Sequence, residues 1–305
     1  MKNYIIAMMF LSLIVQIPAF AWAGVPGSSA QNDTIIVLDS AKYFIEFDSP
    51  VHAIAFDSKN KLYAGGKNKV YYIDEKSNIR LFATLSDTSS KTFIWGMTFD
   101  QKGNLYLAAH DRIVKIDSNG IQETIIKENY GGPCGATDVR IDSANYLYIV
   151  YDNIVAQYDT LLNKKIIVDG ENFNPPIKWA VGIELDNRSE RIFIGDGEGN
   201  KLLIVPFKRQ AYAVESKIIL SSWGQYLTKD EYGNIFLSMH GPETFPEFLY
   251  LDESFHPQKI FLKSRPLQNE RLYKKAIAYG KHCSRDKGIY CIIGNKIYIY
   301  PISDI

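Results

Sequence analysis

A repeat of about forty-three residues runs through most of the chain and constrains its fold more than any other feature. The clearest copies read IAFDSKNKLYAGGKNKVYYID at 54–74, MTFDQKGNLYLAAHDRIVKID at 97–117 and VRIDSANYLYIVYDNIVAQYD at 139–159. In each copy an apolar residue precedes an Asp, a Leu-Tyr pair follows and a second Asp closes the unit. The register aspartates are spaced by 43, 42, 44 and 44 positions: Asp57, Asp100, Asp142, Asp186 and Asp230. A degenerate sixth copy covers 276–302, so the chain is an array of similar units.

Each unit reads as four short antiparallel strands, with the Asp-x-x-Gly/Asn stretch forming a tight turn between the first two. Four such strands cannot bury both faces alone, and radial stacking of four-stranded sheets gives a β-propeller. The sequence therefore predicts an all-β fold, a six-bladed β-propeller of four-stranded antiparallel blades. The predicted repeats lie at about 51–93, 94–135, 136–179, 180–223, 224–273 and 274–305.

The sixth unit lacks a fourth strand, because only five residues follow Tyr300. Two segments near the N-terminus, 34–38 and 42–47, are both strand-like. We expect one of them to complete blade six, so that the ring is closed by an N-terminal strand and few strand edges stay open.

Residues 1–23 have the pattern of a secretory signal peptide. Lys2 precedes a mainly apolar run, and Ala21-Trp22-Ala23 supplies the small residues expected before a cleavage site. An uncleaved membrane anchor is the alternative, although the run is short for a bilayer and contains Gln16 and Pro18. We therefore expect 24–305 to form a single propeller domain, secreted or periplasmic, without a membrane span after signal cleavage.

Charge and cysteine content narrow the partners and the compartment. The chain has 34 Lys+Arg and 34 Asp+Glu, and this balance argues against a nucleic-acid partner, which requires excess positive charge. Export would place the cysteines in an oxidising compartment, and Cys283 and Cys291 flank a predicted hairpin turn. We expect a disulfide between them, with two free thiols as the alternative. Cys134 is then left over and is expected to be a loop thiol rather than a nucleophile.

The repeat units resemble those of the NHL-repeat propellers and the related SMP-30/gluconolactonase-like superfamily. The resemblance rests on FDQKGNLY at 99–106, and on GIELD at 182–186 followed by IFIGD at 192–196. It covers most of residues 51–302 and implies the fold rather than one activity, because such propellers serve as enzymes, sensors and scaffolds.

The resemblance also implies where a site would lie. In such propellers the loops leading into the first strand of each blade share one face with the loops joining strands two and three. In this sequence that face would combine aromatic and acidic side chains, which suit a small polar ligand, a sugar-like molecule or a peptide or protein partner. The predicted ligand-binding residues are His52, Trp95, Asp138, Trp179, Asp196, Trp223 and His240. The alternative for the tryptophans is that they only pack between blades.

Gluconolactonase-like relatives further imply a divalent cation held by Glu, Asn and Asp side chains. Here the segment leading into blade one, 50–53, has no Glu, and the segments at 180–182 and 223–226 lack the Asn and the Asp. Only Asp138 matches, so no cofactor is expected for a binding module. The metal-dependent lactonase remains the alternative, with Ca²⁺ or Mg²⁺ held by Asp138, Asp196 and Glu198. A third possibility is a structural part of an envelope assembly that binds through blade edges.

Overall fold

The computed structural model describes most of the repeat region. The described residues are 35–86, 93–128, 130, 135–173, 176–206, 216–220, 223–240, 248–252, 254, 256–264, 274–280, 287–293 and 295–302. The first five repeats each supply four strands that pair in chain order, and the sixth supplies three. The second strands of the first three repeats, 62–65, 105–109 and 147–151, are buried at every position, because neighbouring sheets cover both of their faces.

The first three blades are built in the same way. Blade one contains β3 (Ala53–Phe56), β4 (Leu62–Gly65), β5 (Lys69–Ile73) and β6 (Ile79–Thr84). Blade two contains β7 (Ile94–Phe99), β8 (Leu105–Ala109), β9 (Arg112–Ile116) and β10 (Gln122–Lys127). Blade three contains β11 (Ala136–Ile141), β12 (Leu147–Tyr151), β13 (Ile154–Tyr158) and β14 (Lys164–Asp169), followed by the short 3-10 helix η1 (Gly170–Asn172).

The last three blades depart from this plan only at the end of the chain. Blade four contains β15 (Ala180–Asp186), β16 (Arg191–Asp196), β17 (Lys201–Pro206) and β18 (Ser216–Ile219). Blade five contains β19 (Trp223–Lys229), β20 (Ile235–His240), β21 (Phe248–Leu251) and β22 (Pro257–Ser264). Blade six has three strands from the C-terminal repeat, β23 (Lys274–Gly280), β24 (Gly288–Ile293) and β25 (Lys296–Pro301).

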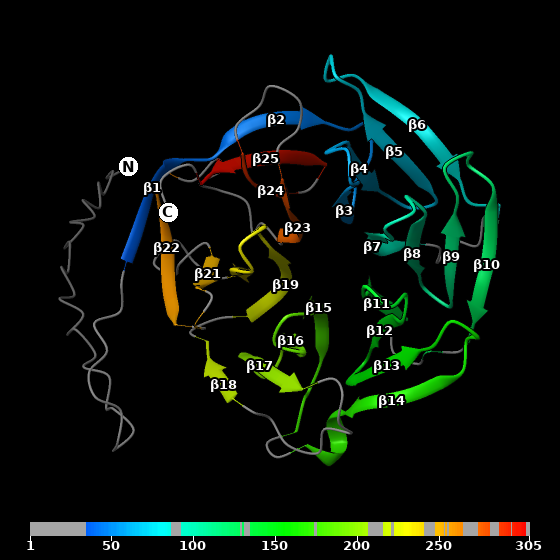
Figure 1. Ribbon diagram of the computed structural model, residues 1–305. Coiled ribbons are helices and arrows are strands. Elements are labelled where there is room, and N and C mark those ends of the chain that lie inside the picture. The colour runs from blue at the N-terminus through cyan, green and yellow to red at the C-terminus, as the bar shows by residue number, and fades with distance from the viewer. Residues whose placement is uncertain are drawn as a thin grey trace, which may run out of the picture. The chain divides into compact units, whose positions relative to one another are not determined.

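The N-terminal segment closes the ring with two strands. β2 (Lys42–Glu46) pairs antiparallel with β25 and becomes the fourth strand of blade six, as predicted. β1 (Ile35–Ser40) instead pairs parallel with β22 and adds a fifth strand to blade five, which the sequence did not predict. The chain start therefore joins the two last blades, as the dark blue ribbon beside β22 and β25 shows (Figure 1).

The first strand of each blade is its inner strand, and the six inner strands contact one another in a closed circle. The buried apolar residues form six clusters, one between each pair of neighbouring blades. The predicted six-bladed propeller is thus confirmed, and its core is a set of interfaces around a ring axis (Figure 1).

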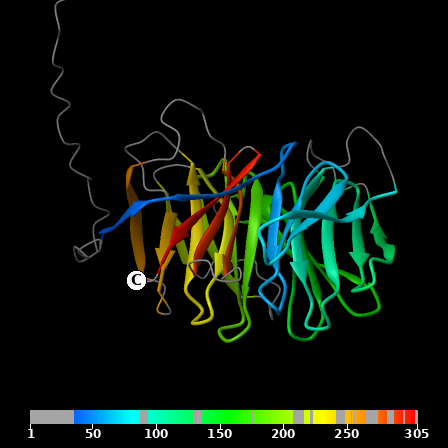
Figure 2. The same cartoon turned by 90° about the horizontal axis from the view of Figure 1, so that it is seen from above.

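The repeated aspartates are explained by the turns. In blade two, the Asp100 carboxylate accepts backbone N–H donors from Lys102 at 2.9 Å and Asn104 at 2.8 Å. Gly103 lies between them with a φ of 83°, a left-handed conformation that favours glycine or asparagine. The same bonds recur at Asp57, Asp74, Asp117, Asp142, Asp159, Asp230 and Asp252. The repeat signature is therefore a turn signature, and these turns form one face of the ring, which we call the turn face (Figure 2).

Within the described part of the chain, no helix has the length and apolar character needed to cross a membrane. The predicted signal peptide lies outside the described residues and stays a prediction.

Candidate functional site

The face opposite the turns, which we call the mouth face, is formed by two sets of loops. The backbone N–H of Ile94, at the start of blade two, donates to the Gly66 carbonyl in the loop between β4 and β5 at 3.1 Å. The equivalent bonds join Ala136 to His110 and Ala180 to Asp152, both at 2.8 Å. The loops that lead into inner strands therefore do lie beside the loops between second and third strands, as the resemblance implied.

Three aromatic rings pack together on the mouth face between blades one and two. The His52 ring lies 5.0 Å from the Trp95 ring and 5.3 Å from the Phe93 ring, centroid to centroid. His52 is only 5% exposed, whereas Trp95 and Phe93 are half-buried. The indole Nε1 of Trp95 is buried, and among the described residues it has no hydrogen-bond acceptor. A buried donor without an acceptor is costly, so this N–H is an unsatisfied group on the mouth face.

Asp138 lies deep in the ring and is already fully engaged. One of its carboxylate oxygens accepts the backbone N–H of Val139 at 2.9 Å and the Arg140 guanidinium at 2.6 Å. The other accepts the backbone N–H of Ile183, in the next blade, at 3.0 Å. Gly96 makes room for it, because a Cβ at that position would lie 2.6 Å from both the Cα and the Oδ1 of Asp138.

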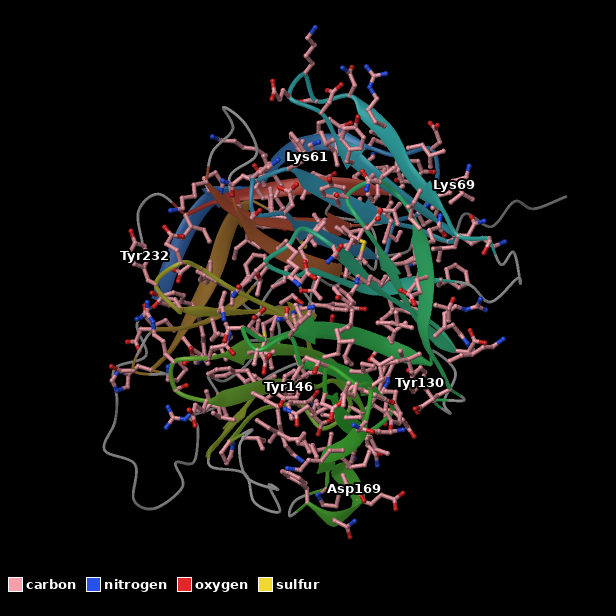
Figure 3. All side chains as sticks on the ribbon, turned by 45° about the vertical axis from the view of Figure 1, so that its right-hand side comes forward. Lys61, Lys69, Tyr130, Tyr146, Asp169 and Tyr232 are labelled. Carbon is pink, nitrogen blue, oxygen red and sulfur yellow. The ribbon has the colours of Figure 1, made fainter. Side chains whose placement is uncertain are left out.

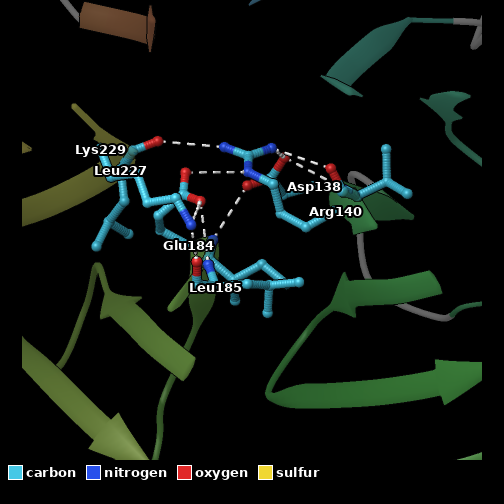
Figure 4. Close-up of polar contacts among 8 residues, drawn as sticks. Asp138, Arg140, Glu184, Leu185, Leu227 and Lys229 are labelled. Atoms are coloured by element: carbon cyan, nitrogen blue, oxygen red, sulfur yellow. Dashed lines mark hydrogen bonds and ion pairs between the residues drawn. The ribbon is translucent and has the colours of Figure 1, made fainter. Parts of the chain in front are cut away.

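Arg140 extends this pairing over three blades, and we call the side chains of Asp138, Arg140, Glu184 and Lys229 the axial cluster (Figure 4). From β11, Arg140 donates to the Leu227 carbonyl of β19 at 3.2 Å, and its Nε lies 3.4 Å from the Glu184 carboxylate of β15. Lys229 lies 3.9 Å from Glu184 and donates to the Leu185 carbonyl. The cluster contains two acidic and two basic groups, so it is neutral as a whole.

Burial dominates the electrostatics of Asp138. It raises the pKa of Asp138 to about 6, although the Arg140 guanidinium and two backbone N–H donors favour the charged carboxylate. A guanidinium that donates to two carboxylates and two carbonyls in this setting is a fixed part of the fold. Charge is therefore balanced within the ring rather than presented to a ligand.

These residues do not fit the cation site of the gluconolactonase-like enzymes. A hard cation requires several open oxygen ligands, yet the oxygens of Asp138 face Arg140 and backbone donors. Among the described residues there is no group of three or more His, Cys, Asp or Glu side chains placed to hold a metal ion. The structure thus does not assemble Asp138, Asp196 and Glu198 into such a group.

Asp196 and Glu198 occupy the loop at the end of β16. The Asp196 side chain is fully buried and accepts backbone N–H donors from Trp179 at 3.1 Å and Gly199 at 2.9 Å. It therefore fastens the loop leading into blade four, whereas Glu198 is exposed. Trp179 itself is half-buried against the apolar cluster between blades five and six.

The remaining predicted residues are described only in part. Trp223 and His240 lie opposite each other in the β19–β20 ladder, but their side chains lie outside the described structure. Cys291 is buried in β24, whereas Cys283 and Cys134 lie outside the described residues. The Cys283–Cys291 disulfide thus stays a prediction.

Sequence reasoning missed three members of the axial cluster: Arg140, Glu184 and Lys229. A signal was present, because Arg140 and Glu184 both stand two residues before a register aspartate, in consecutive repeats. Opposite charges at equivalent positions of neighbouring blades indicate an ion pair across the blade interface.

Comparison with known proteins supports the fold and stops there. No family model matches the sequence, and no curated protein matches it. A streptogramin B lyase structure is 15% identical with a TM-score of 0.58, covering 85% of this chain and 96% of that chain. The chain shares its propeller fold.

Two further structures show the same likeness. One is a catalytically inactive histidine-to-alanine variant of virginiamycin B lyase from Staphylococcus aureus with quinupristin. It is 13% identical with a TM-score of 0.59, covering 85% of this chain and 97% of that chain. A candidate gluconolactonase is 9% identical with a TM-score of 0.62, covering 87% of this chain and 93% of that chain. The predicted resemblance to gluconolactonase-like propellers is confirmed at the level of the fold.

Proposed function

We propose that the protein is an exported binding module that takes a small polar ligand or a peptide at the mouth face of its propeller. The observation that carries the proposal is the Trp95 indole N–H, buried beside His52 and Phe93 without an acceptor among the described residues. The half-buried rings of Trp95 and Phe93 suit a ligand with an apolar face, and a hydrogen-bond acceptor on that ligand would satisfy the buried N–H once the Trp95 ring turns toward it; sugars and peptides have both features.

The axial cluster supports binding over metal-dependent hydrolysis. Lactonase or lyase chemistry, which the names of the structural neighbours describe, belongs to those proteins. For a lactonase-like reaction this chain would need open oxygen ligands near Asp138, and Arg140 occupies that place. The pattern of residues 1–23 supports export to the periplasm or the outside of the cell.

The proposal can be tested by a thermal-shift screen of the purified protein against monosaccharides, disaccharides, amino acids and short peptides. Compounds that bind the folded state raise its melting temperature by mass action. The affinity of each such compound is then measured by calorimetry for the wild type and for Trp95→Phe, which keeps an aromatic ring but removes the N–H. We expect Trp95→Phe to weaken binding about 5- to 30-fold, the usual effect of one lost hydrogen bond to a ligand.

Tyr232→Phe is the matched control, because it removes one polar group from an exposed ring on the turn face. Equal affinities of wild type and Trp95→Phe would place the ligand away from the aromatic cluster and contradict the proposal. Lactone hydrolysis that requires Ca²⁺ or Mg²⁺ and stops with chelator would favour the enzyme instead.

A further inference from the structure

One turn of the turn face has a large apolar residue at a position where the other described turns have a small or polar one. In seven of the described turns the third residue after the aspartate is left-handed. Six of these residues are small or polar: Asn60, Ser77, Gly103, Gly120, Asn145 and Gly233. The seventh is Leu162, in the β13–β14 turn of blade three, with a φ of 64°. A residue with a branched, bulky side chain is disfavoured in this conformation, so Leu162 is a poor choice for the turn itself.

The turn that contains Leu162 has the same hydrogen bonds as the other turns, so the leucine does not change the backbone of the turn. The Asp159 carboxylate accepts the backbone N–H of Leu161 and of Asn163, both at 2.8 Å, as in the sister turns. Leu161 is 81% exposed and Leu162 is 42% exposed, so neither contributes much to the core. Two adjacent apolar side chains at a turn tip, one of them in a disfavoured conformation, indicate selection for a contact outside the monomer.

A cavity of about 640 Å³ lies at the base of this tip, between blades three and four. Residues on both sides of the leucines line it, namely Asp159 before them and Asn163 and Lys165 after them. The rest of the wall includes the half-buried ring of Tyr146 (Figure 3) and the acidic residue Glu190. The cavity therefore combines an aromatic surface with charges of both signs, directly beside a protruding apolar tip.

We propose that this surface pairs with its own copy in a second molecule, the leucine tip of each entering the cavity of the other. A two-fold axis beside the tip brings knob and recess together twice in one interface, as isologous dimers require. The charges support this partner, because the two-fold axis would place Lys165 of each copy near the acidic Glu190 of the other. A lipid surface would cover the leucines but would leave the charged cavity against the membrane. The inference concerns the outer edge of blade three and is independent of ligand binding at the mouth face.

The test is sedimentation velocity of the purified full chain over a range of concentrations. The variant Leu161→Asn/Leu162→Gly gives blade three the Asn-Gly pair that blade two has at Asn119 and Gly120. Because this pair suits a left-handed turn, we expect the melting temperature of the dilute protein to stay or rise. We expect the dissociation constant of the dimer to rise at least about tenfold, as for loss of a central apolar contact.

Ile121→Asn is the matched control, since Ile121 is 67% exposed on the corresponding hairpin of blade two and does not line the cavity. It should leave the dimer intact, and any association through the N-terminal segment is common to all three proteins. A wild type that is monomeric at every concentration would overturn the proposal, as would a dimer that the tip variant leaves unchanged. Sedimentation of a monomeric wild type with vesicles of phosphatidylglycerol and phosphatidylethanolamine, lost in the tip variant, would reassign the leucines to a membrane.

Discussion

The inner strands of blades one and two differ sharply from those of blades three to five, although the repeat is the same. Two residues before the register aspartate, blades one and two carry Ala55 and Thr98, whereas blades three and four carry Arg140 and Glu184. All of these blades meet through apolar clusters, and blades three to five are joined by the axial cluster in addition. The repeat therefore determines the backbone and its turns, whereas the residues around the ring axis differ from blade to blade.

The largest effect is expected for Arg140→Ala, measured against Thr98→Ala at the same repeat position. Loss of Arg140 leaves the carboxylates of Asp138 and Glu184 buried without their main partner. We expect a fall in the free energy of unfolding of about 3–5 kcal/mol, as for other buried pairs broken on one side. Thr98→Ala should cost less than about 1 kcal/mol. Urea unfolding measures both losses. Equal losses would show that the axial cluster contributes no more to stability than the small side chains of blades one and two.

The axial cluster should also make the stability of the protein depend on pH. The pKa of Asp138 is raised from 3.8 to about 6 in the folded protein, so between these values the folded state binds more protons than the unfolded state. The stability that Asp138 contributes is therefore fully present at low pH and is lost as the pH rises toward 6. The loss amounts to at most about 3 kcal/mol, because a tenfold change in proton affinity corresponds to about 1.36 kcal/mol.

Asp138→Asn removes this titration, so the stability difference between wild type and variant should change between pH 4 and pH 7. The free energy of unfolding of the wild type should fall relative to that of the variant as the pH rises over that range. A difference that stays constant with pH would show that Asp138 does not titrate there. A wild type that gains on the variant as the pH rises would show a lowered pKa and contradict the expected sign.

The smallest difference in stability is expected at the turns, because blades one and two have the same turns as blades three to five. Asp57→Ala in blade one and Asp142→Ala in blade three each remove a side chain that accepts two backbone N–H donors. Each should lower the free energy of unfolding by about 1–2 kcal/mol, the usual effect of losing such a cap. The two losses, measured by urea unfolding, should agree within about 1 kcal/mol. A much larger loss of stability for Asp142→Ala would show that blades one and three differ at their turns as well as around the ring axis.

The sequence predicted most of the fold because the turns repeat. An Asp followed three residues later by a left-handed residue, most often Gly or Asn, forms the turns of the turn face, so the signal recurs with the blade. β1 was not predicted as a fifth strand because its pairing partner lies in β22, and no repeat unit contains that pairing. Arg140 was missed for a related reason, since it bonds to Leu227 two blades away and only the ring geometry brings them together.

The mouth face could be predicted only as a location. The loops that form it differ in length and composition from blade to blade, so no periodicity predicts their contacts. The positions of His52 and Trp95 next to inner strands predicted a place on the mouth face, but the packing between their rings became visible only in the structure. Asp196 shows the limit of this reasoning, because a carboxylate in a loop can serve backbone N–H donors as well as a ligand.

The pairing of β2 with β25 has a consequence for how the protein is made. Lys42 pairs with Ile299 and Glu46 with Lys296. Among the described strands, β2 is the second along the chain, and it pairs with β25, the last. Contacts between such distant parts of a chain form slowly, because a long loop must close before they contribute any stability. During synthesis from the N-terminus the ring therefore cannot close until residues 296–301 have emerged. Until then β2 lacks its partner strand, so closure of the ring is a late step that follows synthesis of the sixth blade.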